Sequence, residues 1–282
     1  MINVVNRLRG GFMYFLVGLI AGYVLLVVVL SFAQRSLLYH PDSTTPEPQQ
    51  YGLDQMEALR ISTEDGVQLY AWLQAPSQPE KPMLISFHGN AGNLGFRAEK
   101  VRTYVDAGIG VLMITWRYNA GSGGKPSEPA LVIDARAALN FVRDTGVADK
   151  QVVVYGESLG SGLAVALAAE NHIGAVVLEA PYTTIPDLAQ HHYWYVPAKW
   201  LVRDRYDSLT HIAEVSSPVM IVHGESDRVV PVKFGRLLFE AAPEPKEAHF
   251  IANARHEDLY DHGAAQLVLS FIERHLEHRL EK

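Results

Sequence analysis

The N-terminal segment has a different hydrophobic pattern from the rest of the chain. Residues 11–33 form an apolar run without a single charged side chain. A helix rises about 1.5 Å per residue, so about 20 residues cross a hydrocarbon core of about 30 Å. The run therefore predicts one membrane-spanning helix within residues 1–35. A helix buried in a soluble core is the alternative, but uncharged runs of this length are rare in soluble domains.

Beyond residue 57, short apolar runs alternate with segments that have helical spacing. Strands are predicted at residues 59–63, 67–75, 82–87, 110–115, 151–155, 175–178, 219–222 and 248–251. Helices are predicted at residues 94–107, 129–143, 158–169, 233–241 and 259–280. Most of the short runs are apolar throughout, which is typical of strands covered on both faces. The alternation predicts an α/β fold whose mostly parallel sheet has helices on both faces.

A proline-rich, polar segment separates the apolar run from this alternating region. It predicts a linker, or a loop over the domain surface, at residues 36–56. The chain is thus expected to comprise an anchor at residues 1–35 and one domain at residues 57–282.

An aromatic-rich stretch at residues 181–212 interrupts the alternation of strands and helices. It predicts either a cap over a binding site or an ordinary surface pair of helices. As a cap, it would hold an apolar substrate group with Tyr193, Trp194 and Trp200, because ligand sites are mostly apolar. Alternatively, these rings pack against the domain or touch a membrane surface.

The charges around the apolar run predict its orientation. Arg7 and Arg9 precede it, and Arg35 follows it. The positive-inside rule places the N-terminus in the cytoplasm and the domain on the extracytoplasmic side. Residues 31–33 (Ser-Phe-Ala) resemble a signal-peptide cleavage site, so a signal peptide is the alternative. The run exceeds the usual signal-peptide core of about 7–15 residues, which favours an uncleaved anchor.

Composition excludes several classes of function. The net charge is −7 and basic residues are not clustered, which argues against a nucleic-acid partner. The chain has no cysteine, so disulfides, thiolate metal sites and a cysteine nucleophile are excluded. It also lacks the H-E-x-x-H metal motif. We expect neither a metal nor a cofactor.

The sequence Gly156-Glu157-Ser158-Leu159-Gly160 lies between a predicted apolar strand and a predicted helix. This is the G-x-S-x-G pattern in the setting that a nucleophile elbow requires. The turn would hold the Ser158 oxygen at a helix N-terminus, where the helix dipole favours negative charge. Ser158 is therefore the predicted nucleophile. The alternative is a serine that only caps a glycine-flanked helix.

A candidate acid and a candidate base follow the last two predicted strands. Asp227 lies in the loop after strand 219–222, with Glu225 as a rival acid. His256 lies in the loop after the final strand, with His262 as a rival base. An acid in this position orients the histidine and stabilises its charged form.

The loop His88-Gly89-Asn90-Ala91-Gly92-Asn93 follows the strand predicted at residues 82–87. It predicts one half of an oxyanion hole, in which the backbone N–H groups of Asn90 and Leu159 bind the developing negative charge. The alternative is a glycine-rich turn without a ligand. We expect His88 to order this loop rather than to act as a base.

Several stretches together resemble a known family: HGNAGN (88–93), GSGGKPSE (121–128), GESLG (156–160), RYDSL (205–209), HGESDRVVP (223–231) and ARHED (254–258). From about Leu37 onward the chain resembles the α/β-hydrolase-domain proteins. The likeness is greatest to the branch with an N-terminal membrane segment, which includes bacterial membrane-anchored hydrolases and eukaryotic protein depalmitoylases. The resemblance implies a triad of Ser158, Asp227 and His256 and a backbone oxyanion hole. Relatives usually have a Tyr-Arg-Gly-Tyr-Gly type segment where this chain has Trp-Arg-Tyr-Asn-Ala at residues 116–120.

These features predict a membrane-anchored serine hydrolase that cleaves an ester, thioester or amide through an acyl-enzyme. Its substrate is expected to be a small or lipidic acyl compound. A peptidase of the serine-aminopeptidase kind is one alternative, and a non-catalytic, membrane-tethered binding protein is another. A binding protein has no need of nucleophile, base, acid and oxyanion loop together, which argues against it.

Overall fold

A single eight-stranded sheet with the order β1-β2-β4-β3-β5-β6-β7-β8 forms the centre of the domain. The computed structural model describes residues 2–276, with side chains from residue 11 onward. The strands are β1 (Glu57–Ser62), β2 (Gln68–Gln74), β3 (Met83–Phe87), β4 (Gly110–Ile114), β5 (Val152–Glu157), β6 (Ala175–Glu179), β7 (Val219–Gly224) and β8 (Lys246–Ile251). Strand β2 pairs antiparallel with β1 and β4, and every other pair is parallel.

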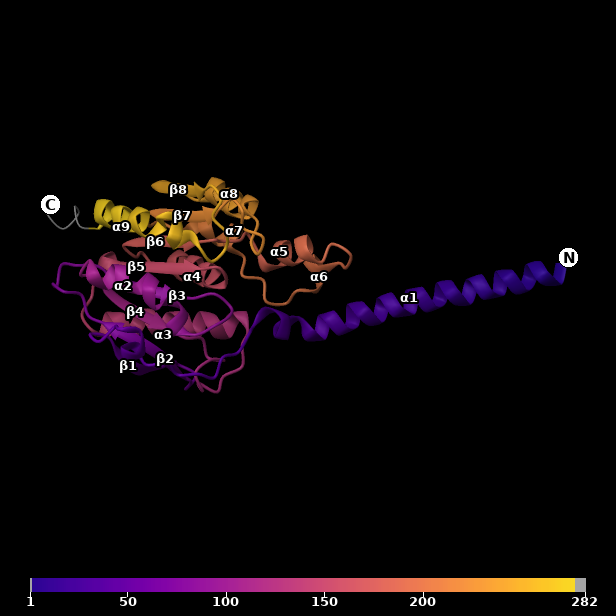
Figure 1. Ribbon diagram of the computed structural model, residues 1–282, viewed down its shortest axis with the longest axis horizontal. Coiled ribbons are helices and arrows are strands. Elements are labelled where there is room, and N and C mark those ends of the chain that lie inside the picture. The colour runs from indigo at the N-terminus through magenta and orange to yellow at the C-terminus, as the bar shows by residue number, and fades with distance from the viewer. Residues whose placement is uncertain (1, 277–282) are drawn as a thin grey trace.

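Helices cover both faces of the sheet (Figure 1). Helices α3 (Glu128–Asp144), α4 (Leu159–Glu170) and α8 (Val232–Ala241) pack into one hydrophobic cluster, and α2 (Ala98–Asp106) and α9 (Ala264–His275) into the other. Short 3-10 turns are η1 (Pro48–Tyr51), η2 (Leu94–Arg97), η3 (Asp149–Gln151), η4 (Ile212–Glu214) and η5 (Leu259–His262). The predicted α/β class is therefore confirmed. Residues 277–280 of the predicted last helix lie outside the described residues.

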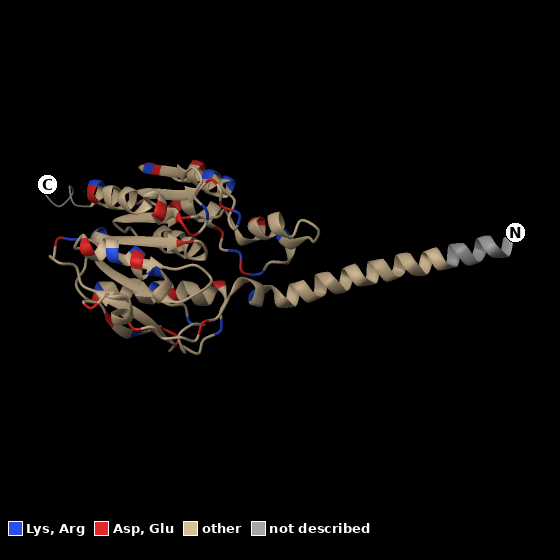
Figure 2. Ribbon diagram, viewed as in Figure 1, with Lys and Arg blue, Asp and Glu red and all other residues tan. Residues whose placement is uncertain are grey.

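One long helix, α1 (Ile2–Leu38), projects away from the domain (Figure 1). Its part from Gly11 to Leu38 has a mean hydropathy of 2.7 and is long and apolar enough to cross a membrane. Figure 2 shows no charged residue along this part until the helix reaches the domain. An N-terminal apolar helix of this kind occurs both in membrane anchors and in signal sequences.

The polar segment after α1 lies against the domain. Tyr39 is buried, and its hydroxyl is 2.8 Å from the hydroxyl of Tyr206. Further along, the Pro46 carbonyl accepts hydrogen bonds from the Tyr70 hydroxyl and the Trp72 indole, both at 2.9 Å. These bonds hold the segment over strand β2, so α1 continues into the domain without a free stretch of chain.

The aromatic-rich stretch follows β6 and forms helices α5 (Ile185–His192), α6 (Ala198–Leu201) and α7 (Ser208–His211). We call this stretch, residues 181–212, the cap. Figure 1 shows α5 and α6 beside the end of α1 that is nearer the domain. Arg35 at that end forms an ion pair with Asp204, with 2.8 Å between Nε and Oδ2. The cap therefore packs against the N-terminal helix as well as the domain.

Candidate active site

Ser158 occupies a strained turn between β5 and α4. Its backbone has φ 51° and ψ −117°, a region that side-chain-bearing residues rarely adopt. The turn is closely packed: a Cβ added to Gly156 would lie 2.6 Å from the Gly160 carbonyl oxygen, and one added to Gly160 would lie 2.1 Å from the Phe87 carbonyl oxygen. Both positions therefore require glycine. Strain of this kind persists where the surrounding structure enforces it, most often at functional sites.

The Ser158 side chain makes no cap hydrogen bond to α4 and instead faces His256. Its Oγ lies 3.1 Å from His256 Nε2, and His256 Nδ1 lies 2.7 Å from Asp227 Oδ2. A carboxylate can only accept hydrogen bonds, so Nδ1 carries the imidazole proton and Nε2 is free to accept one from Ser158. The other carboxylate oxygen of Asp227 accepts two backbone N–H groups at 2.8 Å, from Val229 and Val230. The structure thus brings together the three residues that the sequence singles out.

The rival acid and base lie outside this chain of contacts. Glu225 forms a half-exposed ion pair with Arg236 at 2.6 Å. His262 lies 4.0 Å from Asp258. The surroundings of these two residues are those of ordinary surface groups.

Burial and hydrogen bonds set the protonation states of the pair. Burial alone would raise the pKa of Asp227, but hydrogen bonds from His223 and His256 outweigh it and hold that pKa well below its usual range. Burial would lower the pKa of His256, but the hydrogen bond and charge of Asp227 raise it above its ordinary value. Asp227 is therefore a carboxylate at neutral pH. It favours a positively charged His256, as a general base needs during proton transfer.

The loop after β3 lies next to Ser158. A Cβ added to Gly89 would lie 3.5 Å from Ser158 Cβ, which is van der Waals contact, so this part of the loop packs directly against the serine. The loop is held from behind, because Asn90 donates from Nδ2 to the Leu38 carbonyl at 2.9 Å and accepts at its own carbonyl from Tyr118. Leu159 opens α4, where the first backbone N–H groups lack helical acceptors.

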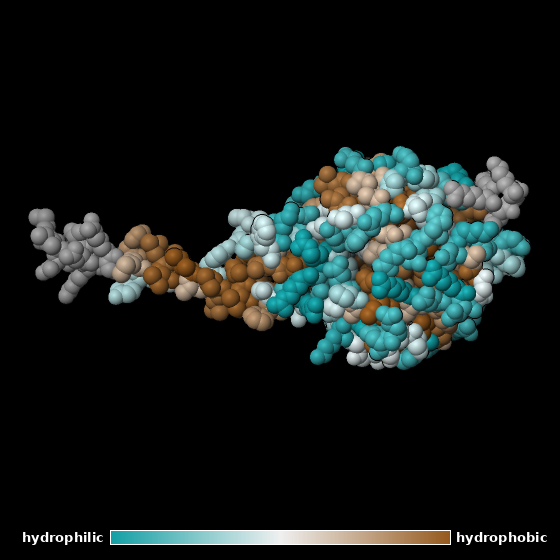
Figure 3. Space-filling model, turned by 180° about the vertical axis from the view of Figure 1, so that it is seen from behind, coloured by the Kyte–Doolittle hydropathy of each residue, from teal (hydrophilic) through white to brown (hydrophobic). Residues whose placement is uncertain are grey.

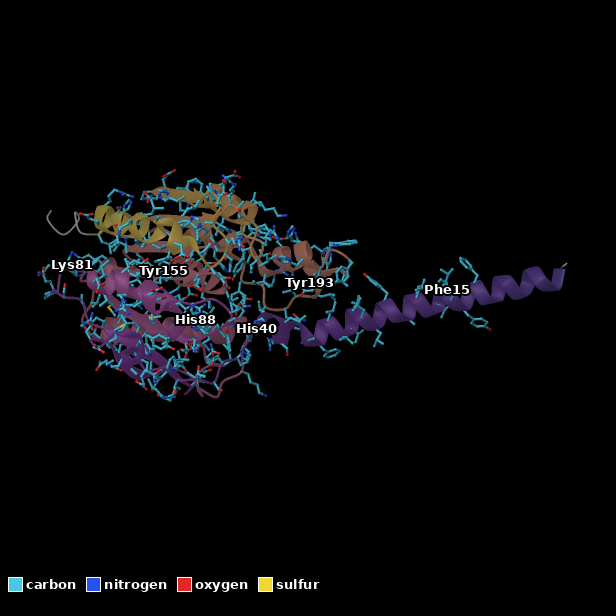
Figure 4. The ribbon with its side chains drawn as sticks, in the orientation of Figure 1. Phe15, His40, Lys81, His88, Tyr155 and Tyr193 are labelled. Carbon is cyan, nitrogen blue, oxygen red and sulfur yellow. The ribbon has the colours of Figure 1, made fainter. Side chains whose placement is uncertain are left out.

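His88 is completely buried, and Figure 4 shows it between the sheet and the end of α1. Its Nδ1 lies 2.7 Å from the Gly89 carbonyl. Burial lowers the pKa of His88 to about 3, so the ring is neutral. The Trp116 indole donates to the His88 carbonyl at 3.1 Å. The stretch at residues 116–120 that departs from the family pattern therefore supports this loop.

A cluster of charged residues forms one wall of the site. The Glu157 carboxylate forms ion pairs with Arg97 and Lys100, each at 2.7 Å. Lys100 also forms an ion pair with Glu179 at 2.6 Å. Burial opposes the charge of Glu157, but Lys100 and Arg97 together hold the pKa of Glu157 well below its usual value. The Tyr155 hydroxyl donates to Glu179. None of these charged residues was predicted from the sequence to belong to the site. The signal for this cluster was a pair of cations three residues apart on a predicted helix and an acid at the end of each of two buried strands.

A cavity of about 440 Å³, which we call the Ser158 cavity, opens between these groups. It is lined by Gly89, Asn90, Ala91, Gly92, Phe96, Arg97, Lys100, Glu157, Ser158, Glu179, His256 and Glu257. The three aromatic residues predicted to bind substrate do not line it. Tyr193 lines a second cavity of about 190 Å³ between α1 and the cap, which we call the α1–cap cavity. Trp194 and Trp200 are 78% and 86% exposed and line neither cavity.

Within the described part of the chain, no group of three or more His, Cys, Asp or Glu side chains is placed to hold a metal ion. The chemistry that the arrangement offers is proton transfer: a hydroxyl, an imidazole and a carboxylate in series beside backbone N–H groups.

Comparison with known proteins identifies the family. The model of the α/β-hydrolase fold family matches residues 82–211. An uncharacterized Mycobacterium tuberculosis protein, Rv2307c, is 34% identical over 80% of this chain and 81% of its own length. Protein bem46 of Schizosaccharomyces pombe is 32% identical over 80% of this chain and 79% of its own length. A solved structure of the Pyrococcus furiosus esterase Pf2001 has a TM-score of 0.69, with 18% identity over 84% of this chain and 99% of its own length. On its fold and its relatives, the chain belongs to the α/β-hydrolase superfamily, whose fold is typical of serine hydrolases.

Proposed function

We propose that this protein is a membrane-anchored serine hydrolase that transfers an acyl group from an ester, thioester or amide to water. The observation that carries the proposal is the unbroken series from Ser158 Oγ through His256 to Asp227, with steps of 3.1 and 2.7 Å, at the wall of a cavity of about 440 Å³. The similar Pyrococcus protein is an esterase, which agrees with an ester substrate.

The reaction would proceed in two halves. His256 Nε2 takes the proton from Ser158 Oγ as that oxygen attacks the substrate carbonyl, and the charge of Asp227 stabilises the imidazolium. Backbone N–H groups of Asn90 and Leu159 bind the oxyanion, each contributing about 3–4 kcal/mol in comparable sites. His256 then returns the proton to the leaving group. Water, activated by the same imidazole, attacks the acyl-enzyme and releases the acid.

The anchor in this proposal is α1, which would keep the domain at the membrane, with the N-terminus in the cytoplasm and the domain on the other side. The positive-inside rule supports this orientation, because Arg7 and Arg9 precede the apolar run. The likeness to the branch with an N-terminal membrane segment supports the anchoring itself. A substrate carrying a lipidic acyl group fits a site held at a membrane, because such compounds are concentrated there.

The test uses the full-length chain in membranes and a fluorophosphonate probe, which reacts with activated serines. We expect labelling of the wild type and none of Ser158→Ala. Ser161→Ala is the matched control. Ser161 lies in the first turn of α4, but its Oγ donates a hydrogen bond to the Ser158 carbonyl at 2.6 Å rather than to His256, so its loss should leave the labelling in place. Labelling that persists in Ser158→Ala would refute the assignment, and an unreactive wild type would favour a binding protein. Parallel assays on p-nitrophenyl esters and aminoacyl amides separate an esterase from a peptidase.

A further inference from the structure

The tip of the cap, residues 193–201, presents large aromatic rings to its surroundings. Trp194 is 78% exposed, Tyr195 46% and Trp200 86%, whereas Trp72 and Trp116 are fully buried in the domain. Exposed apolar patches mark interaction sites, and Trp and Tyr are the residues enriched where proteins meet the edge of a bilayer.

The tip is fastened to the apolar part of α1. The Tyr23 hydroxyl donates to the Tyr195 carbonyl at 3.3 Å, and Gln34 Nε2 donates to the Leu201 carbonyl at 3.2 Å. In Figure 3 the lobe of the cap and the hydrophobic helix lie side by side. The segment that carries the aromatic rings is therefore held against α1 at Tyr23 and Gln34.

The length of α1 sets how deep this tip must lie. Residues 10–22, which separate Arg9 from Tyr23, number 13 (22 − 10 + 1) and rise about 20 Å as a helix. A hydrocarbon core is about 30 Å thick, so a span that begins directly after Arg9 ends near Val29. Tyr23 then lies about 9 Å inside the core, six residues from its edge. Tyr195 is bonded to Tyr23, so the tip lies at a similar depth.

We infer that residues 193–201 form a second membrane-contact site, which enters the bilayer surface that α1 crosses. The inference rests on the proposed anchoring through α1. Interfacial segments with Trp on their apolar face are buried about 5–10 Å, which agrees with the depth set by α1. The partner is a phospholipid bilayer surface. With α1, the contact would fix both the distance of the domain from the bilayer and its tilt relative to the bilayer. Asn90, which lines the Ser158 cavity, is hydrogen-bonded to Leu38 at the end of α1, so this cavity would be held in a fixed position relative to the membrane.

The chain's tryptophans provide the test, because two of the four are buried in the domain and two lie on the tip. The full-length protein is reconstituted in phosphatidylcholine vesicles whose lipids carry bromine near the top of the acyl chains. Bromine quenches tryptophan on contact, so we expect wild-type emission to fall relative to unbrominated vesicles. The double variant Trp194→Phe/Trp200→Phe should lose this quenching, and each single variant part of it. Phenylalanine keeps a ring at each site, and retained fluorophosphonate labelling verifies the fold.

Alkaline carbonate extraction of the same vesicles tests the anchor separately. A wild type that resists extraction but is not quenched would overturn the inference and leave the anchor intact. Quenching that persists in full in the double variant would also overturn it. Release of the wild type by carbonate would refute the anchor and the inference together. Lipids brominated near the methyl ends should quench less than those brominated near the headgroup, because the tip lies near the surface.

Discussion

The Ser158 cavity and the α1–cap cavity differ in what lines them and in how they are built. The Ser158 cavity, of about 440 Å³, is lined by residues at or beyond the carboxyl ends of β3, β5, β6 and β8 and by η2 and α2, and its lining includes two cations and three carboxylates. The α1–cap cavity, of about 190 Å³, lies between a projecting helix and the cap, and most of its lining is aliphatic. The first lies at one edge of the central sheet, and the second is formed jointly by α1 and the cap.

The reactive groups Ser158 and His256 line the polar cavity, whereas the other cavity is the one with mostly apolar walls. Buried charges persist only where they are paired, and in the Ser158 cavity Arg97 and Lys100 pair with Glu157 and Glu179, so this cavity is polar. A long acyl chain would gain little from such walls. The α1–cap cavity offers apolar contact near the proposed membrane, which makes it the candidate site for an apolar group of the substrate.

The largest expected effect concerns the chemistry of the Ser158 cavity. Asp227→Asn should lower kcat by about four orders of magnitude, because an amide favours the wrong imidazole tautomer. Steady-state kinetics of the purified, detergent-solubilised chain measures this. Glu225→Gln is the control, since Glu225 pairs with Arg236 at the surface, and it should leave kcat unchanged. The assignment of the acid is wrong if the two variants exchange these outcomes.

The charged wall provides the next effect, on stability. Lys100→Ala leaves Glu157 and Glu179 without their shared cation, and breaking such a buried pair costs about 3–5 kcal/mol. Lys199→Ala removes an exposed ion pair to Asp187 and should cost about 0–1 kcal/mol. Denaturant unfolding of both variants gives the comparison. Equal, small losses would mean that water already screens the charges of the Ser158 cavity.

A smaller effect tests whether the α1–cap cavity receives the acyl chain. Each buried methylene contributes about 0.8 kcal/mol, so two more should raise kcat/KM roughly tenfold until the cavity fills. Ala189 lines this cavity, and Ala189→Phe should flatten the dependence on chain length. Trp200→Ala is the control, because that ring lines neither cavity. The assay uses p-nitrophenyl esters in detergent, below micelle-forming substrate concentrations.

A flat profile in the wild type would show that no apolar pocket takes the chain. A length preference that survives in Ala189→Phe would place the chain elsewhere.

The smallest expected effect is on pH dependence. The imidazole must be neutral to accept a proton, so kcat/KM falls as the pH drops through the pKa of His256. Burial lowers the pKa of His256, but the hydrogen bond and charge of Asp227 raise it by more than burial lowers it. The pKa of His256 therefore lies above its ordinary value of about 6.5. The acid limb of the profile should therefore lie above pH 6.5 in the wild type and move to lower pH in Asp227→Asn. A limb that stays in place would mean that another group controls it.

The sheet could be predicted from sequence because its strands are short apolar runs. Strand β3, for example, is buried at all five positions and differs from its predicted range by one residue. The order of Ser158, Asp227 and His256 was equally visible, and the structure places them in contact, while their catalytic role stays a prediction. These features depend on local pattern and on the rule that parallel strands end at one edge of the sheet.

The remaining features depend on contacts between distant parts of the chain. The ion pairs of Lys100 require α2 to lie across the ends of β5 and β6, which no local pattern specifies. The polar composition of residues 36–56 concealed the buried side chains of Tyr39, Leu53 and Met56. Composition also does not distinguish an aromatic ring that lines a cavity, such as Tyr193, from one that faces outward, such as Trp200.

No flexible linker separates α1 from the domain, because the Leu38 carbonyl is hydrogen-bonded to Asn90 and the Tyr39 hydroxyl to Tyr206. An enzyme that is attached to a membrane without a linker can act only on substrates very close to that membrane. For the membrane-anchored enzyme proposed above, encounters would become a two-dimensional search among molecules that diffuse in the same leaflet. Turnover would then follow the mole fraction of substrate among the lipids rather than its amount per volume, and identical substrate on a facing vesicle would remain untouched.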